Sequence, residues 1–243
     1  MIDIHCHILP GFDDGASSLE EAVAMASMAV SSGVTAIVTT PHFPGKAESL
    51  RRIGELMDKY QLLREALERR NIPLTLIPGA EILCLPETVH LARRKALPTI
   101  GNSSYLLTEF YFNESPSYMS QTLHSLADAG YRPVVAHPER YKAVQQDPRL
   151  LRFWFEQGFI LQINKDSLLG GFGSQVQTCA ERILQSGMAH IIASDAHSTR
   201  RRTPHMGTLN QWAAECCSPA YFRILTQRNP ARLLQNQDMV PRR

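Results

Sequence analysis

The chain has 243 residues, a charged fraction of 20% and a formal net charge of +2, values that are ordinary for a globular protein. This balance gives no reason to expect nucleic acid as a partner, and no apolar run is long enough to insert into a membrane. Five cysteines without a framework spacing argue against a disulfide scaffold, so we expect a cytoplasmic protein.

Short apolar strands alternate with helix-like segments along the chain, which is the pattern of a parallel α/β fold. Ser18 and Glu21 form a capping-box pattern, which predicts the start of the first helix. No linker interrupts the series, so we expect a single domain over residues 1–243. The seven predicted strands are Met1–His5, Val34–Thr39, Pro73–Ile77, Tyr105–Glu109, Pro133–Ala136, Phe159–Ile163 and His190–Ala193.

The first predicted strand leads into a His-x-His pair, His5 and His7. Residues two apart on a strand lie on the same side, about 6.5 Å apart, so the two imidazoles can converge on one metal ion. Asp195 and His197 repeat this spacing after the last predicted strand.

Metal-competent side chains follow nearly every other predicted strand as well. The carboxyl ends of the strands in a parallel barrel meet at one face, where active sites of this architecture are built, so we expect one shared metal site. His90, His124 and His205 fall elsewhere and are predicted to be surface or hydrogen-bonded histidines. The candidates at strand ends are His5, His7, Asp13 or Asp14, His42, Glu81, Glu109, His137, Asp195 and His197.

These motifs, taken in order, resemble the polymerase-and-histidinol-phosphatase (PHP) superfamily. The segment at residues 8–15, Ile-Leu-Pro-Gly-Phe-Asp-Asp-Gly, is similar to the branch of bacterial tyrosine-protein phosphatases from capsular and exopolysaccharide clusters. The resemblance implies the PHP fold, which is a distorted seven-stranded (β/α) TIM-like barrel. The motifs are Asp3–Gly15, Thr40–His42, Gly79–Glu81, Glu109, Ala136–Arg140 and Ser194–His197.

The resemblance also implies three divalent metal ions. The first would be held by His5, His7, Glu109 and Asp195. The second would be held by Glu81, Glu109 and His137, with Glu109 bridging, and the third by Asp14, His42 and His197. Imidazole and carboxylate ligands without thiolate suit Mn, Fe or Zn better than Mg, and Mn is the preferred assignment.

The implied activity is hydrolysis of phosphotyrosine by metal-activated water, on the flexible tail of a bacterial tyrosine kinase. Glu109 and two arginines are the predicted catalytic residues. Arg140 matches the phosphate-binding arginine of the family, and Arg202 is the preferred second one, with Arg201 as the alternative. A guanidinium group pairs bidentately with phosphate oxygens. The sequence shows no unambiguous general acid, and the candidates are Glu139 and His205.

Aromatic residues next to the predicted ligands are candidates either for the wall of a ring-binding pocket or for ordinary core packing. They are Phe43, Phe110, Tyr111, Phe112 and Tyr141.

Other functions remain open from the sequence. A PHP phosphatase for a small alkyl phosphate, such as histidinol phosphate, would use the same metal site, whereas a non-catalytic binding module would have lost ligands. Cys217 and Arg223 have the spacing of cysteine-dependent tyrosine phosphatases. That mechanism is disfavoured because Pro219 lacks an N–H group and the loop contains no glycine.

Overall fold

The computed structural model describes residues 1–240, and the strands in it are short and parallel. Among these residues the strands are β1 (Ile2–Cys6), β2 (Ala36–Thr39), β3 (His42–Pro44), β4 (Thr75–Pro78), β5 (Glu81–Leu83), β6 (Tyr105–Glu109), β7 (Arg132–Ala136), β8 (Ile160–Asn164) and β9 (Ile191–Ala193). The helices are α1 (Leu19–Ser31), η1 (Ala47–Arg52), α2 (Ile53–Arg69), α3 (Thr88–Arg93), α4 (Pro116–Asp128), η2 (Pro138–Arg140), α5 (Lys142–Gln146), α6 (Arg149–Glu156), α7 (Lys165–Leu168), α8 (Ser174–Gln185), α9 (Thr208–Cys216), α10 (Pro219–Arg223), η3 (Ile224–Arg228) and α11 (Asn229–Leu234).

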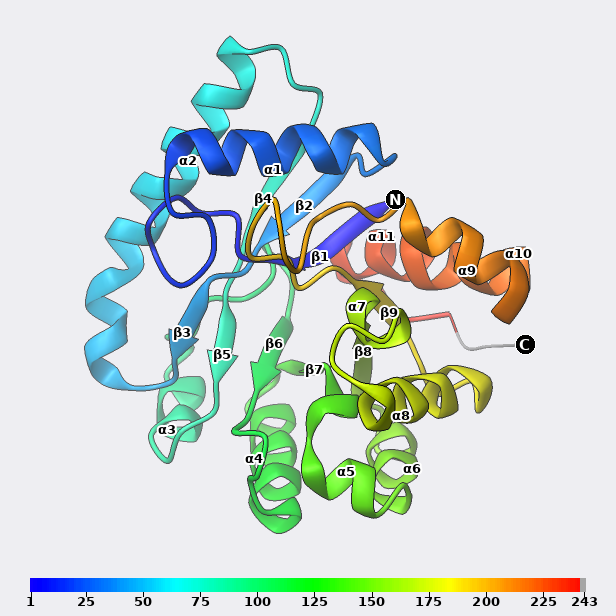
Figure 1. The fold of residues 1–243 in the computed structure, drawn as a ribbon. Coiled ribbons are helices and arrows are strands. Elements are labelled where there is room, and N and C mark those ends of the chain that lie inside the picture. Colours follow the sequence, from blue (N-terminus) through cyan, green and yellow to red (C-terminus); the bar gives the residue numbers. More distant parts are fainter. Residues whose placement is uncertain (241–243) are drawn as a thin grey trace.

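The strands form two parallel sheets, with the helices on their outside (Figure 1). One sheet has the order β1-β2-β4 and the other the order β3-β5-β6-β7-β8-β9. The predicted α/β fold with parallel strands is therefore confirmed. None of the helices within residues 1–240 combines the length and the apolar character that crossing a membrane requires.

The structure has more strands than the seven predicted, because two predicted strands are each followed by a second short strand. Thr40 and Pro41 separate β2 from β3, while Gly79 and Ala80 separate β4 from β5. The register does not change across these breaks, since Thr39 pairs with Pro78 before them and His42 pairs with Glu81 after them. Each pair of short strands thus keeps the same register on both sides of a bend in the chain.

Two residues explain these bends. Pro41 cannot donate a backbone hydrogen bond, but its carbonyl accepts the N–H of Glu81 at 3.0 Å across the break. Gly79 lies so close to β2 that a Cβ atom there would come within 2.8 Å of Val38 Cγ1. The bends were not predicted because both depend on contacts between strands.

Strands β1 and β9 lie side by side at the boundary between the two sheets. The Asp195 N–H donates to the carbonyl of His5, and the His7 N–H donates to the carbonyl of Ala196, both at 2.8 Å. The buried Asp3 carboxylate strengthens this contact by accepting the backbone N–H of Ser194 at 3.0 Å. These bonds bring the His5-x-His7 motif together with the Asp195-x-His197 motif, which lies about 190 residues further along the chain.

Apolar side chains from both sheets form one shared core cluster, which fixes the sheets relative to each other. Its members include Ile4 of β1, Val38 of β2, Leu107 of β6, Val134 of β7 and Ile191 of β9. A second, larger cluster fills the space between the strands and the outer helices.

The predicted start of α1 is confirmed, with a change in one partner. Ser18 Oγ accepts the N–H of Glu21 at 3.2 Å, as a capping residue does. The Glu21 carboxylate, however, accepts from the N–H and hydroxyl of Ser17 rather than returning to Ser18.

Candidate metal centre

The predicted ligands lie together, most of them at or just after the carboxyl end of a strand. His5 and Glu109 belong to strands β1 and β6, His42 and Glu81 begin β3 and β5, and the others follow a strand. Their ligand atoms form four overlapping groups, within each of which the atoms lie within 4.8 Å of one another. The groups are His7, Asp14, His42 and His197; His5, His7 and Glu81; His5, His137 and Asp195; and His42, Glu81 and Glu109.

Glu81 lies at the centre of this cluster, buried among four histidines. Its Oε1 is 3.0 Å from His137 Nε2 and 3.2 Å from His5 Nε2. Its Oε2 is 3.1 Å from His42 Nδ1 and 3.4 Å from His7 Nε2. Burial raises the pKa of the Glu81 carboxyl, but the histidines outweigh burial and bring this pKa well below its usual range. The two oxygens of this carboxylate therefore face different pairs of histidines.

Glu109 lies at the rim of the cluster. Its Oε2 is 3.3 Å from His42 Nδ1 and its Oε1 is 3.6 Å from His137 Nε2. Within residues 1–240 these are its ion-pair contacts, so Glu109 contacts fewer histidines than Glu81 does. Glu81 thus contacts more of the predicted ligands than Glu109, the carboxylate that the family resemblance implies as the bridge.

Asp14 belongs to the group on the outer side of the cluster. Its Oδ1 is 3.5 Å from His42 Nε2 and 3.5 Å from His197 Nε2. The ring centroids of His7 and His197 are 3.9 Å apart, which brings His7 into the same group.

Asp13 and Gln162 orient the first two histidines. Asp13 Oδ2 accepts from His7 Nδ1 at 2.7 Å, and Gln162 Oε1 accepts from His5 Nδ1 at 2.8 Å. When Nδ1 carries the proton, Nε2 is free to bind a metal, and the two Nε2 atoms lie 3.2 Å apart. The sequence left Asp13 and Asp14 as alternative ligands. In the structure Asp13 is hydrogen-bonded to His7 Nδ1, whereas Asp14 faces His42 and His197.

A buried chain of amides continues from Gln162 to the ligands and was missed from the sequence. Gln162 Nε2 donates to Asn164 Oδ1 at 2.8 Å, and Asn164 Nδ2 donates to Asp195 Oδ2 at 2.5 Å. The available signal was the pair of polar residues at alternate positions in the otherwise apolar strand β8.

The donor set fits divalent metal ions. Glu81 Oε2 and His197 Nε2 are buried and accept or donate no well-directed hydrogen bond among the described residues, although Oε2 lies 3.1 Å from His42 Nδ1 and His197 Nε2 lies 3.5 Å from Asp14 Oδ1. A buried polar atom without a hydrogen bond costs roughly 1–3 kcal/mol, and a metal ion would use the lone pair of each atom. Burial lowers the pKa of His197, which keeps its imidazole neutral and able to bind a cation. Nitrogen and oxygen donors without thiolate suit Mn, Fe or Zn.

Two arginines converge on Asp195 beside the cluster. Arg140 Nη1 is 3.4 Å from Asp195 Oδ2, and Arg202 Nη2 is 2.5 Å from Asp195 Oδ1. The guanidinium group of Arg140 lies over two aromatic rings, 4.3 Å from the centroid of Phe112 and 4.5 Å from that of Phe172. Each contact stabilises a fixed position of the Arg140 charge.

Three residues at the site have left-handed backbone conformations. The φ angles are 34° at His137, 50° at Asp195 and 49° at Arg202. Non-glycine residues in this region store strain on the order of 1–3 kcal/mol, and such residues cluster at functional sites. His137 and Asp195 are also predicted ligands and Arg202 is a predicted phosphate-binding residue, whereas Asn71, Lys95 and Asn236 have the same conformation away from the site.

The histidines predicted to lie outside the site do lie outside it. None of the metal-competent groups among the described residues contains His90, His124 or His205. Glu139, one of the candidates for a general acid, is fully buried, and its Oε1 accepts the N–H of Asn164 at 2.9 Å.

Parallel strands that end in a cluster of imidazoles and carboxylates, with arginines beside it, define an α/β protein with a candidate metal site. The chain belongs to the CpsB/CapC family of capsular polysaccharide synthesis, which matches residues 1–235.

Individual relatives agree with this family membership. The chain is 36% identical to the tyrosine-protein phosphatase YwqE of Bacillus subtilis, over 84% of this chain and 80% of YwqE. It is 29% identical to the tyrosine-protein phosphatase CpsB of Streptococcus pneumoniae, over 98% of this chain and 99% of CpsB.

Solved structures show the same fold. A chain from the crystal structures of YwqE and CpsB, described as unique metal-dependent tyrosine phosphatases, superposes with a TM-score of 0.89 at 33% identity, covering 100% of this chain and 97% of that one. The phosphotriesterase homology protein of Escherichia coli superposes with a TM-score of 0.59 at 12% identity, covering 96% of this chain and 98% of that one, which supports the fold alone.

Proposed function

We propose that this chain is a metal-dependent protein-tyrosine phosphatase. The observation that carries the proposal is the convergence of the Glu81-centred ligand cluster with two arginines, Arg140 and Arg202, at Asp195. The names of the relatives YwqE and CpsB support the same activity. Retention of every predicted ligand argues against a non-catalytic binding module.

The proposed cofactors are three divalent ions, with Mn preferred over Fe or Zn. We assign Glu81 rather than Glu109 as the bridging carboxylate, because Glu81 faces histidines on both sides. The ligands proposed for the three ions together are His5, His7, Asp14, His42, Glu81, Glu109, His137, Asp195 and His197. Ions held there would supply positive charge and lower the pKa of water from ~15.7 toward ~7.

The two arginines bind and orient the phosphate in this proposal. Each guanidinium group presents a planar fork that can pair with two phosphate oxygens, and both groups already face the same point at Asp195. Buried Asp195 holds Arg140 and Arg202 in place before substrate arrives. Binding a phosphate then requires little further ordering of these side chains.

A cavity next to the ligands suits an aromatic leaving group. It has a volume of about 300 Å³ and is lined by His42, Pro44, Leu83, Glu109, Phe110, Tyr111 and Phe112. Of the aromatic residues considered from the sequence, Tyr111 and Phe112 are exposed to 54% and 39%, while Phe43, Phe110 and Tyr141 are buried. Tyr111 and Phe112 are therefore the proposed wall for the phenyl ring, and the other three pack in the core.

The finer description of the fold is also part of this proposal. We propose that the strands form one distorted seven-stranded (β/α) barrel, in which β2 with β3 and β4 with β5 each act as one bent strand. The bridge between Cys6 and Ala196 would join the first strand to the last. The chain would then be one PHP-type domain over residues 1–243, and we propose a cytoplasmic location.

The proposed substrate is the phosphotyrosine-bearing tail of a bacterial tyrosine kinase that controls capsule or exopolysaccharide synthesis. A phenolate, whose conjugate acid has a pKa of ~10, leaves with little help from a general acid. A flexible tail can enter a site at strand ends that a folded surface cannot reach.

A substrate panel tests the proposal against the runner-up, a phosphatase for histidinol phosphate. One metal-loaded preparation is assayed with phosphotyrosine peptide, phosphoserine peptide and histidinol phosphate. We expect kcat/KM to favour phosphotyrosine by at least about tenfold, because the aromatic wall and the better leaving group act together. A preference for histidinol phosphate would establish the runner-up instead.

A further inference from the structure

The loop after His197 carries three consecutive arginines and has a fixed conformation. Ser198 Oγ accepts the N–H groups of Arg200 at 3.2 Å and Arg201 at 3.0 Å, and donates to the carbonyl of Arg201 at 2.7 Å. The N–H of His197 donates to the carbonyl of Arg202 at 2.8 Å, which closes the loop. The three side chains therefore start from a rigid backbone.

This backbone sends the arginines to different environments. Arg202 turns toward Asp195 and is only 25% exposed, whereas Arg200 and Arg201 are exposed. Within residues 1–240 neither Arg200 nor Arg201 forms an ion pair. Arg201 thus stands without a carboxylate partner at the edge of the proposed phosphate site, whereas Arg200 shares a second pocket with Glu21 and helps to lower the pKa of that carboxyl.

The buried Lys165, at the start of α7, holds the end of the same loop by a hydrogen bond. Lys165 Nζ donates to the carbonyl of Thr203 at 2.6 Å and lies 3.2 Å from Asp166 Oδ1. Asp166 is the one carboxylate among the residues that line the neighbouring cavity, and Lys165 compensates its charge. The side chains that line the cavity therefore carry a net positive charge.

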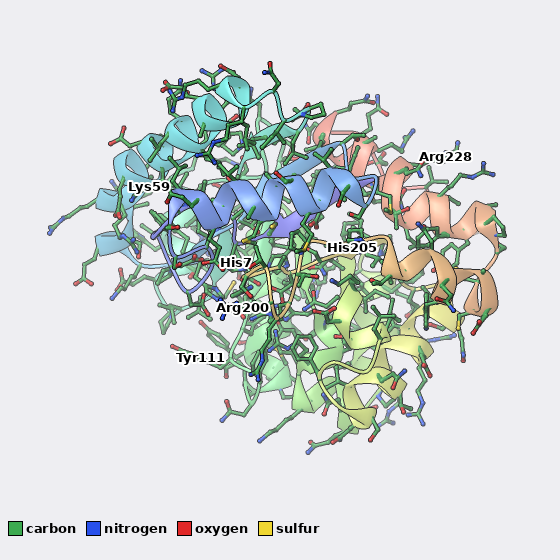
Figure 2. All side chains as sticks on the ribbon, turned by 45° about the horizontal axis from the view of Figure 1, so that its top comes forward. His7, Lys59, Tyr111, Arg200, His205 and Arg228 are labelled. Atoms are coloured by element: carbon green, nitrogen blue, oxygen red, sulfur yellow. The ribbon has the colours of Figure 1, made fainter. Side chains whose placement is uncertain are left out.

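The cavity under the loop is large and adjoins the phosphate-binding arginines. It has a volume of about 630 Å³ and is lined by Asp166, Leu169, Gly171, Phe172, Arg200, Arg201, Arg202 and Thr203. Phe172 connects it to the site, because its ring lies 4.5 Å from the Arg140 guanidinium and 5.8 Å from that of Arg202. In Figure 2, Arg200 is labelled just below His7 on the same side of the molecule as Tyr111.

We propose that this cavity binds an anionic side chain next to the phosphotyrosine, either a carboxylate or a second phosphate, through Arg201 and Arg200. The inference rests on the proposed function. Side chains two positions apart on an extended peptide lie on the same side, about 6.5 Å apart, so a flanking residue can reach Arg201 while the reacting phosphate contacts Arg202. Positive charge at the rim also accelerates the encounter with an acidic peptide. The substrate class is thus an acidic phosphotyrosine segment.

The test compares flanking residues and charge-reversal variants in the metal-loaded full chain. Phosphotyrosine peptides flanked by alanine, by glutamate or by a second phosphotyrosine are assayed, together with p-nitrophenyl phosphate, which has no flanks. Arg201→Glu is compared with Arg201→Gln and with Arg228→Glu, a matched charge reversal. Arg228 is exposed and projects from the opposite end of the molecule from Tyr111 (Figure 2). Metal content and thermal unfolding confirm that each variant is folded.

We expect the wild type to prefer an acidic flank in kcat/KM, and Arg201→Glu to reduce that preference about fivefold or more. The rate on p-nitrophenyl phosphate and on the alanine-flanked peptide should stay within about twofold, and added salt should weaken the preference because the charges are exposed. The two acidic peptides show whether carboxylate or phosphate gives the larger effect.

Equal losses on acidic and neutral peptides, equal losses in Arg228→Glu, or no acidic preference in the wild type would each overturn the inference. Failure to hydrolyse any phosphotyrosine peptide would instead overturn the proposed function. In that case the competition of each peptide against p-nitrophenyl phosphate still measures the flank preference.

Discussion

Glu81 Oε1 lies 3.0 Å from His137 Nε2, although Glu81 begins strand β5 and His137 follows strand β7. The other oxygen of the same carboxylate faces His42 at 3.1 Å. Glu81 therefore spans the cluster, whereas Glu109 contacts it from the rim. This difference in position makes the two carboxylates separable by mutation.

Glu81→Gln should reduce activity more than Glu109→Gln. The glutamine amide has no negative charge and only one oxygen that can bind a metal ion, whereas the carboxylate has two. We expect a loss of more than about a hundredfold in kcat, together with loss of bound metal. Elemental analysis and turnover of a phosphotyrosine peptide measure both effects, with the exposed Glu215→Gln as control. A larger loss of metal in Glu109→Gln would restore Glu109 as the bridge.

A chelator should abolish the phosphatase activity, and added Mn²⁺ should restore it. Thiol alkylation should have little effect, because the proposed chemistry uses no cysteine nucleophile. The structure supports this expectation, since Cys217 precedes helix α10 (Pro219–Arg223) rather than a glycine-rich phosphate loop. An inactive Cys217→Ser variant with normal fold and metal content, or full activity of metal-free protein, would contradict the metal mechanism.

His190 should make the fold sensitive to acid independently of the metal site. Burial lowers the pKa of His190 from 6.5 to about 4, and its Nδ1 accepts the N–H of Leu161 at 3.1 Å, which requires the neutral ring. Because the folded pKa is depressed, the stabilisation is present above pH 6.5 and is lost as pH falls toward 4. The loss is at most about 3 kcal/mol in the free energy of unfolding.

Urea unfolding between pH 7 and 4 checks this prediction by comparing the wild type with His190→Asn, which keeps an acceptor near the Nδ1 position. The contribution of metal release cancels in the difference between the two proteins. The wild type should lose more stability than the variant over this range. Parallel pH profiles would show that His190 does not stay neutral in the folded state.

The place of the site was predictable from the sequence because strand ends are a topological feature. His5, His137 and Asp195 are far apart in the chain, yet each follows or ends a parallel strand, and parallel strands put these ends at one face. The two-residue spacing in His5-x-His7 and Asp195-x-His197 added that the paired side chains share one side of the strand.

The contacts within the site were not predictable in the same way. Whether Glu81 or Glu109 lies at the centre depends on the bends at Pro41 and Gly79, which arise from contacts between strands. The orienting role of Gln162 depends on a hydrogen bond across 157 positions of the chain. A periodic pattern carries no information about such pairings.

Arg140→Ala should leave the metals bound but remove a charge-assisted contact to the phosphate. Such contacts contribute roughly 2–4 kcal/mol in the transition state, which corresponds to a loss of about thirty- to a thousandfold in kcat/KM. Arg140→Lys keeps the charge but not the planar fork, so it should rescue the rate only in part. Full rescue by lysine would indicate simple charge attraction.

Phe172→Leu tests whether the placement of the Arg140 guanidinium group matters, because this substitution leaves the charge of Arg140 unchanged. Leucine keeps an apolar side chain but removes the ring face 4.5 Å from the guanidinium, while Phe112 still covers the other side. A cation–π contact at a partly exposed site contributes about 0.5–1 kcal/mol, so kcat/KM should fall about two- to fivefold. Phe172→Tyr should retain the wild-type rate, because it preserves the face. In an Arg140→Lys background, Phe172→Leu should reduce kcat/KM by a smaller factor, since the ammonium group lacks the planar face that stacks on the ring. An equal reduction in both backgrounds would show that Phe172 does not act through Arg140.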